Sequence, residues 1–153
     1  MLAQGNTVLA GYWENPEASA DALDGGWFHT GDGGTVDDAG FLTISDRKKD
    51  VIISGGENVS SIEVEDAVFS HPAVAEVAVI GVPDDRWGEM VTALVVLAEG
   101  ATASEAEIIA HCRTTLAGFK APKRVEFRDA IPRTATGKIQ KFILRERANQ
   151  DGT

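Results

Sequence analysis

Short apolar runs alternate with glycine-rich turns over the first 45 residues of the chain. Three of these runs predict short strands, at residues 7–10, 27–28 and 41–44. Between the second and the third lies the polar sequence 37–40, Asp-Asp-Ala-Gly, which is typical of a hairpin turn. The runs are too short to form a core of their own, so this segment predicts strands and tight turns.

From residue 50 the apolar runs become longer and richer in valine. Continuous runs predict buried strands, and residues 125–127 alternate as in a half-buried strand. The expected strands are residues 51–53, 74–82, 91–97 and 125–127. The polar residues 83–85 predict the turn between the second and the third, and Ser54–Asn58 is expected to link the first strand to a helix.

Two serine–glutamate spacings mark helix starts in the same part of the chain. Ser60 with Glu63, and Ser104 with Glu107, have the spacing of a capping box. They predict helices over residues 60–70 and 104–118, and residues 141–148 predict a last helix. The whole pattern is that of an α+β fold: a small mixed domain with a short sheet flanked by helices, preceded by a glycine-rich β segment.

The charges are unevenly distributed along an acidic chain. The net charge is −10, yet residues 119–153 carry nine bases and four acids. A basic end on an acidic protein favours a small polyanionic ligand over nucleic acid, which the rest of the surface would repel. No apolar run is long enough for a transmembrane helix, and the single cysteine, Cys112, excludes an internal disulfide. We therefore expect a cytoplasmic protein that binds no nucleic acid.

Three polar segments could carry chemistry, and each also has a structural explanation. Asp32, behind a glycine, could accept hydrogen bonds from ribose hydroxyls, or could bond its own turn. The glycines of Ser54–Asn58 would let a ligand approach the backbone, or simply form a turn. Lys138, on the basic loop 132–138, could reach a phosphate, or could lie on a mobile surface loop.

Taken in order, these segments resemble the C-terminal end of the adenylate-forming, AMP-binding superfamily, most closely the acyl-CoA synthetases, which are fatty-acid and aryl-CoA ligases. The matching stretches are Gly11–Ala18, Gly26–Asp32, Asp46–Asn58, Glu63–Glu65, Gly81–Asp84 with Trp87–Glu89, and Pro132–Lys138. Three positions depart from the family pattern, one of them Ser19, where threonine is common. Gly33 stands where an apolar residue is more usual, and Ala121 where some relatives have a base.

The resemblance implies an ATP-dependent, AMP-forming acid–thiol ligase. A carboxylic acid would attack the α-phosphorus of ATP, giving an acyl-adenylate and pyrophosphate, and the thiol of coenzyme A would then displace AMP. Magnesium would accompany the ATP, with no metal ligand expected in this chain. The family pattern places the ribose hydroxyls on Asp32 and Arg47, and the catalytic lysine at Lys138.

For the second step, the resemblance implies that a small mobile domain turns about a pivot at Lys49. The glycines Gly55 and Gly56 would then border the channel of the pantetheine arm, where a Cβ would obstruct the thiol. The remaining expected contacts to coenzyme A are two aromatic and two basic residues: Trp87, Phe119, Lys120 and Lys123.

The same resemblance predicts the domain organisation. Residues 1–48 would be the last strands of a large N-terminal adenylation domain, and residues 49–153 the mobile C-terminal domain. The main ATP and acyl sites belong to that large domain, so we expect the 153-residue chain to be inactive alone. Two alternatives remain: a non-enzymatic interaction module, for instance a homodimer, and an adenylation domain that acts on a carrier-protein thiol.

Overall fold

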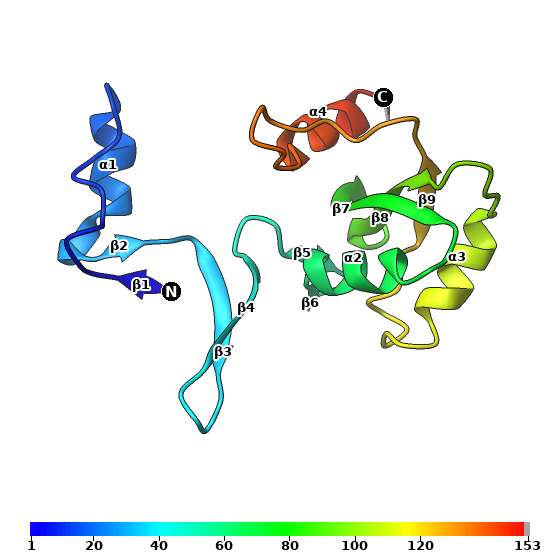
Figure 1. The fold of residues 1–153 in the computed structure, drawn as a ribbon, viewed down its shortest axis with the longest axis horizontal. Coiled ribbons are helices and arrows are strands. Elements are labelled where there is room, and N and C mark those ends of the chain that lie inside the picture. The colour runs from blue at the N-terminus through cyan, green and yellow to red at the C-terminus, as the bar shows by residue number, and fades with distance from the viewer. Residues whose placement is uncertain (152–153) are drawn as a thin grey trace. The chain divides into compact units, whose positions relative to one another are not determined.

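The structure is a computed structural model that describes residues 1–151. It divides into two compact units, Met1–Lys49 and the chain from Asp50 onward. Figure 1 colours the first unit blue to cyan and the second green to red. Each unit has its own sheets and helices.

The first unit begins with a pair of very short strands and one short helix. Strand β1 (Leu2–Ala3) pairs antiparallel with β2 (Phe28–His29). Helix α1 (Pro16–Ala22) was not predicted, although its start has a clear signal: the Asn15 side chain accepts a hydrogen bond from the N–H of Ala18. A single 3₁₀ turn, η1 (Asp24–Gly26), follows. The strand predicted at residues 7–10 is wrong, because a turn bond from Val8 N to Gly5 O bends the chain there.

The second half of this unit is a hairpin that confirms the predicted turn at residues 37–40, although the strand before the turn is residues 32–36 rather than 27–28. Strands β3 (Asp32–Val36) and β4 (Leu42–Arg47) pair antiparallel, and Asp37 Oδ1 accepts two backbone hydrogen bonds within the turn. The register shifts between Gly33 and Gly34. A Cβ on Gly34 would lie 2.5 Å from the carbonyl oxygen of Thr43, whereas one on Gly33 would meet only an ordinary contact at 3.6 Å. The backbone therefore requires glycine at Gly34 and tolerates other residues at Gly33, where the family pattern has an apolar one.

The second unit is built on a five-stranded sheet whose centre is a long ribbon. The ribbon consists of β7 (Val74–Asp84) and β8 (Gly88–Leu97), paired antiparallel along their whole length. It is longer than predicted, so the turn falls at residues 85–87 rather than 83–85. Strand β9 (Arg124–Phe127) joins β8 in parallel, and β5 (Ile52–Ser54) joins it through the pair Ser54↔Gly88.

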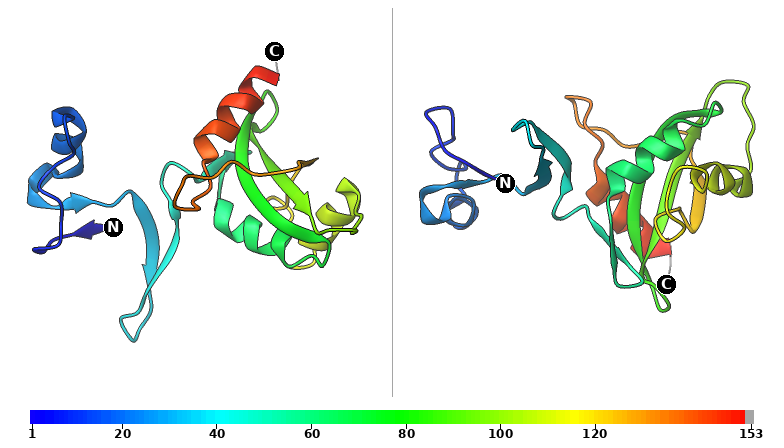
Figure 2. Two further views of the ribbon diagram at one scale, coloured as in Figure 1. Left: turned by 45° about the horizontal axis from the view of Figure 1, so that its top comes forward. Right: turned by 90° about the horizontal axis from the view of Figure 1, so that it is seen from below.

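Helices cover both faces of this sheet, as Figure 2 shows. On one face, α2 (Ser61–Phe69) and α3 (Glu105–Cys112) pack on a cluster that includes Val79, Val95 and Ile108. On the other face, α4 (Lys141–Asp151) packs on a second cluster, in which Ile80 and Leu94 are almost fully buried. The prediction of an α+β fold with a short sheet flanked by helices is therefore confirmed.

The helix starts were predicted better than the helix ends. Ser60 caps α2, and Ser104 with Glu107 forms both hydrogen bonds of a capping box on α3. Helix α3 ends at Cys112 rather than at residue 118, however. The hydroxyls of Thr114 and Thr115 donate to carbonyl oxygens at the end of the helix, which turns the chain away from the helical path.

The segment Ser54–Asn58 corrects another prediction. It does not link a strand directly to a helix, because β5 is followed by β6 (Glu57–Val59) in an antiparallel hairpin. The two residues at its tip, Gly55 and Gly56, have φ values of 62° and 84°. Two successive positive φ angles are what a tight hairpin turn demands, and glycine supplies them without strain.

Candidate functional site

In the first unit, the hairpin places Asp32 opposite Arg47. The two are register partners, and Arg47 Nε lies 3.4 Å from Asp32 Oδ1. The Asp32 side chain is 21% exposed and that of Arg47 56%, so both can be reached from solvent. The family resemblance assigned both residues to the ribose, and the structure places them within 3.4 Å of each other.

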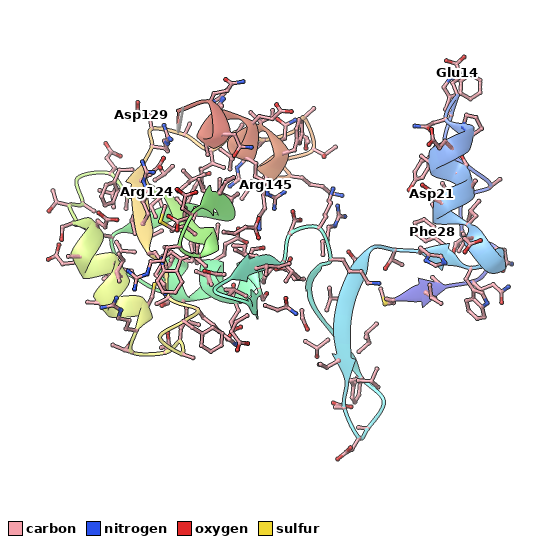
Figure 3. All side chains as sticks on the ribbon, turned by 180° about the vertical axis from the view of Figure 1, so that it is seen from behind. Glu14, Asp21, Phe28, Arg124, Asp129 and Arg145 are labelled. Carbon is pink, nitrogen blue, oxygen red and sulfur yellow. The ribbon has the colours of Figure 1, made fainter. Side chains whose placement is uncertain are left out.

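A hollow of about 550 Å³ adjoins this pair. It is lined by two aromatic residues, by charged residues and by residues 30–31. One of the aromatic residues, Phe28, is labelled in Figure 3. The lining residues are Tyr12, Phe28, Thr30, Gly31, Asp32, Arg47, Lys48 and Lys49. A flat ligand with vicinal hydroxyls could lie on the aromatic side chains and bond the carboxylate and guanidinium.

Lys49, the predicted pivot, is the last residue of the first unit. It is exposed and lies in a turn between β4 and β5, next to Asp50, which begins the second unit. A turn residue at a unit boundary is the kind of position that can absorb a change in backbone angles. The role of Lys49 as a pivot stays a prediction.

In the second unit, Gly55 is in contact with Trp87. The Gly55 N–H donates to the carbonyl oxygen of Trp87 at 2.7 Å, and a Cβ on Gly55 would lie 3.2 Å from the indole ring. Gly56 has open space where its Cβ would be. The structure therefore adds a second reason for glycine at Gly55, besides the channel expected from the sequence: the hairpin tip must let the indole pack against it.

Two cations lie over the same indole. Lys123 Nζ is 5.5 Å and the Arg86 guanidinium carbon 4.9 Å from the ring centroid of Trp87. Lys123 Nζ also donates to three backbone carbonyl oxygens, and burial, with a smaller effect of the charge on Arg113, lowers its pKa. Sequence reasoning missed Arg86, and its place next to Trp87 in the turn was the available signal.

Phe119 and Lys120 lie on the loop before β9 that also carries Lys123, one of the two cations over Trp87. Lys123 Nζ bonds the carbonyl oxygen of Phe119, whose ring is 44% exposed. Lys120 Nζ lies 6.0 Å from the centroid of that ring and forms an ion pair with Glu63 at 2.7 Å. The departure at Ala121 is now explained in part, because this residue is fully buried and offers no surface to a ligand.

The predicted catalytic lysine, Lys138, lies on an ordered turn rather than on a mobile loop. Its N–H donates to Thr134 Oγ1, and its carbonyl oxygen accepts from the Thr134 N–H at 2.8 Å. Arg133 braces the turn by bonding the Gly137 carbonyl oxygen and the carboxylate of Glu76. Among the described side chains, of residues 1–150, and the described backbone, the exposed ammonium of Lys138 has no hydrogen bond or ion pair, so it is available to an anion.

The predicted residues thus fall into three groups: the Asp32–Arg47 pair, Lys138, and the residues around Trp87. Among the side chains that the structure describes, those of residues 1–150, no three of His, Cys, Asp or Glu are arranged to hold a metal ion. The described helices also include none with the length and apolar character to span a membrane.

Comparison with known proteins gives one consistent family. The AMP-binding enzyme C-terminal domain matches residues 63–138. A long-chain-fatty-acid–CoA ligase of Mycobacterium tuberculosis is 52% identical over 95% of this chain, which covers 29% of that enzyme. A feruloyl-CoA synthase of Amycolatopsis is 50% identical over 96% of this chain, which covers 30% of it.

A solved structure agrees with these relatives. ATP-bound MatB from Rhodopseudomonas palustris superposes with a TM-score of 0.90 at 42% sequence identity, over 99% of this chain and 30% of that one. The chain therefore spans about 30% of the length of the proteins that it matches.

Proposed function

The chain belongs to the adenylate-forming, AMP-binding enzymes, whose C-terminal domain it contains, and we propose that it works as the C-terminal part of an acyl-CoA synthetase. One observation carries the proposal. The second unit has two chemically distinct sites on separate elements: the free ammonium of Lys138, and the aromatic and cationic residues around Trp87. Two sites on one rigid unit suit a reaction with two half-reactions.

In the first half-reaction, a carboxylate attacks the α-phosphorus of ATP and pyrophosphate leaves. Lys138 would lie against the carboxylate and the α-phosphate, where its point charge stabilises the negative charge that develops in the transition state. Asp32 would accept hydrogen bonds from the ribose hydroxyls while Arg47 donates to the ribose, so that the nucleotide is held in a fixed orientation.

In the second half-reaction, the thiolate of coenzyme A attacks the acyl carbon, a thioester bond forms and AMP leaves. The hairpin tip at Gly55 and Gly56 would border the pantetheine arm. The Trp87 and Phe119 rings are suited to stacking on the adenine of coenzyme A, and Lys120 and Lys123 to binding its phosphates. A turn of the second unit about Lys49 would exchange one half-reaction for the other.

Magnesium is expected with the ATP, as for phosphoryl-transfer substrates in general. The described residues provide no carboxylate or histidine cluster for a metal ion. We expect the phosphates of ATP to be the principal ligands of the ion, and the absence of a metal ligand in this chain stays a prediction.

The test uses a chimera in which residues 1–153 replace the matching part of the Mycobacterium tuberculosis ligase. With palmitate and ATP, the chimera should release pyrophosphate, and Lys138→Ala should lower that rate by about a hundredfold or more because the charge on the α-phosphate is lost. Arg128→Gln, which removes a surface ion pair elsewhere, is the matched control and should retain the rate.

Equal rates for the chimera with Lys138 and with alanine would refute the role of that residue. The 153-residue chain alone should release no pyrophosphate, because its sequence contains no Ser/Thr/Gly-rich phosphate loop. Thioester formation with coenzyme A, measured against a carrier protein, separates the synthetase from an adenylation domain that loads a carrier.

The exposed side chains of the first unit favour the interaction module as the second candidate. Phe41 is 72% and Trp27 44% exposed, an apolar surface that a partner or a second copy would cover. Dimers in solution, with no binding of nucleotide or coenzyme A by calorimetry, would favour this alternative. The homodimer and the cytoplasmic location stay predictions.

A further inference from the structure

The last helix of the second unit is fastened to the residue that follows the predicted pivot. Asp50 comes directly after Lys49, and its Oδ1 accepts a hydrogen bond from Arg145 Nη2 on α4 at 2.7 Å. Both side chains are largely shielded, with 14% of Asp50 and 28% of Arg145 exposed. Arg145 is labelled on α4 in Figure 3. A shielded ion pair with a hydrogen bond holds its geometry better than one in open solvent.

The same face of α4 is fastened a second time, one turn earlier. Lys141 Nζ lies 2.7 Å from Glu65 Oε1 and 2.8 Å from Ser61 Oγ, both on α2. Glu65 Oε1 in turn accepts from the N–H of Val79 on the central ribbon at 2.8 Å. Arg145 and Lys141 are four residues apart and so lie on one side of the helix. The start of α4 is therefore fixed to the core of the unit.

The turn that carries Lys138 leads directly into this helix. Lys138 comes three residues before Lys141, and the Gln140 N–H between them donates to the carbonyl oxygen of Pro132 at 2.9 Å. The base of the turn is closed by the two bonds between Thr134 and Lys138. A route of hydrogen bonds and ion pairs thus runs from Asp50 through Arg145 and Lys141 on α4 to the turn that carries Lys138.

We propose that the Asp50–Arg145 ion pair is a positioning pair for the adenylation half-reaction, which makes α4 a rigid link between the pivot and Lys138. The proposal rests on the proposed function. When the chain turns at Lys49, the pair makes α4 and the Lys138 turn follow Asp50 as one body, and the ammonium arrives at a defined place. Without the pair, Asp50 is joined to α4 only indirectly, through the sheet and through the contacts of Lys141 with α2, and the lysine approaches with a wider spread of positions.

The residues around Trp87 do not depend on this link. They are positioned by the strand pair Ser54↔Gly88 and by the bond from Gly55 N to Trp87 O. Lys123 is held there by its bonds to the carbonyl oxygens of the loop before β9. Loss of the Asp50–Arg145 pair should therefore impair the half-reaction that uses Lys138 and spare the one that uses coenzyme A.

The experiment measures the two half-reactions separately in the same chimera. Adenylation is followed as palmitate-dependent pyrophosphate release without coenzyme A. Thioester formation is followed as the loss of the free thiol of coenzyme A when synthetic palmitoyl-adenylate is supplied. Arg145→Gln and Asp50→Asn should each lower kcat for adenylation about tenfold with little change in the KM for ATP. Thioester formation should change less than about twofold in either variant, because the site around Trp87 keeps its own contacts.

Two further variants distinguish a specific pair from a general loss of structure. The double variant should be no slower than either single one, because both remove the same interaction. Arg145→Lys, which keeps the charge, should restore most of the adenylation rate. Arg128→Gln is again the control for loss of an arginine ion pair, and should leave both half-reactions unchanged.

An equal fall in both half-reactions would mean that the pair only stabilises the fold, and would overturn the inference. Normal adenylation by Arg145→Gln in a chimera that Lys138→Ala inactivates would overturn it too, while leaving the proposed function intact. A folded, unmodified chimera that releases no pyrophosphate would overturn the proposed function itself.

Discussion

The two units of the chain differ sharply in what they bury. In Met1–Lys49, Asp46 is the single buried residue that the structure describes, and apolar side chains such as Phe41 and Ile44 are more than half exposed. From Asp50 onward, a sheet buries one apolar cluster on each face. An isolated two-stranded ribbon is marginal in water, whereas a sheet covered by helices is stable by itself. The second unit can therefore hold its sites in place alone, and the first depends on other contacts.

The largest expected effect tests this contrast with one kind of substitution in each unit. Ile108→Ala, at a fully buried residue on the inner face of α3, should lower the free energy of unfolding by about 2–5 kcal/mol. Ile44→Ala, at a residue that is 53% exposed on β4, should change it by less than about 0.5 kcal/mol. Urea unfolding of the 153-residue chain, followed by circular dichroism, measures both. Similar costs at the two positions would break the comparison.

A smaller effect tests how the second unit holds its candidate site. Gly55→Ala adds a Cβ 3.2 Å from Trp87 at a φ of 62°, and should cost about 1–3 kcal/mol while it shifts the tryptophan fluorescence. Gly100→Ala is matched in backbone angle, with a φ of 73°, but its Cβ would meet open space. This substitution should lower the free energy of unfolding only by the strain of the positive φ, about 1 kcal/mol, and leave the fluorescence unchanged. If both glycines behaved alike, contact with the indole would have no energetic role.

The smallest effect concerns the capping box of α3. Ser104→Ala should lower the free energy of unfolding by about 1 kcal/mol, because two of the hydrogen bonds at the helix start are lost. Bonds from the Ser104 backbone and hydroxyl lower the pKa of Glu107, with burial opposing them slightly. The stabilisation by the ionised Glu107 carboxylate is therefore present above the ordinary pKa of a glutamate and is lost as the pH falls through the lowered value.

The check is the pH dependence of urea unfolding between about pH 7 and pH 3. The unsubstituted chain should lose more stability over the acidic part of this range than Glu107→Gln, which cannot titrate at that position. Parallel curves for the two proteins would show that the box contributes nothing to the pH dependence.

Sequence reasoning succeeded where the decisive contacts are local, and failed where they are not. The hairpin turn at residues 37–40 and the caps at Ser60 and Ser104 depend on neighbours two to four residues away, and all three are present. The strand predicted at residues 7–10 and the end of α3 were wrong, because turn bonds outweigh a weak apolar pattern. The helix α1 was overlooked although Asn15 and Pro16 mark its start.

For the candidate site, the residue types were evident from the sequence but their partners were not. The family resemblance named Lys138 and Trp87, and nothing local indicated that Lys138 would lie on an ordered turn. The Ser54–Asn58 segment was taken for a link to a helix because its two glycines suit many turns. Only the pairing of β5 with β6 shows that it is a hairpin tip.

The amino-acid sequence by itself determined the family, the α+β class, the helix starts and the identity of the candidate residues, since these follow from motif order and short-range patterns. Tertiary structure alone decided that Trp87 packs against Gly55, that Lys123 lies over its ring, and that Asp50 is joined to Arg145. These contacts join residues far apart in the chain, and they exist only once the β7–β8 ribbon has paired and its two faces have been covered by helices.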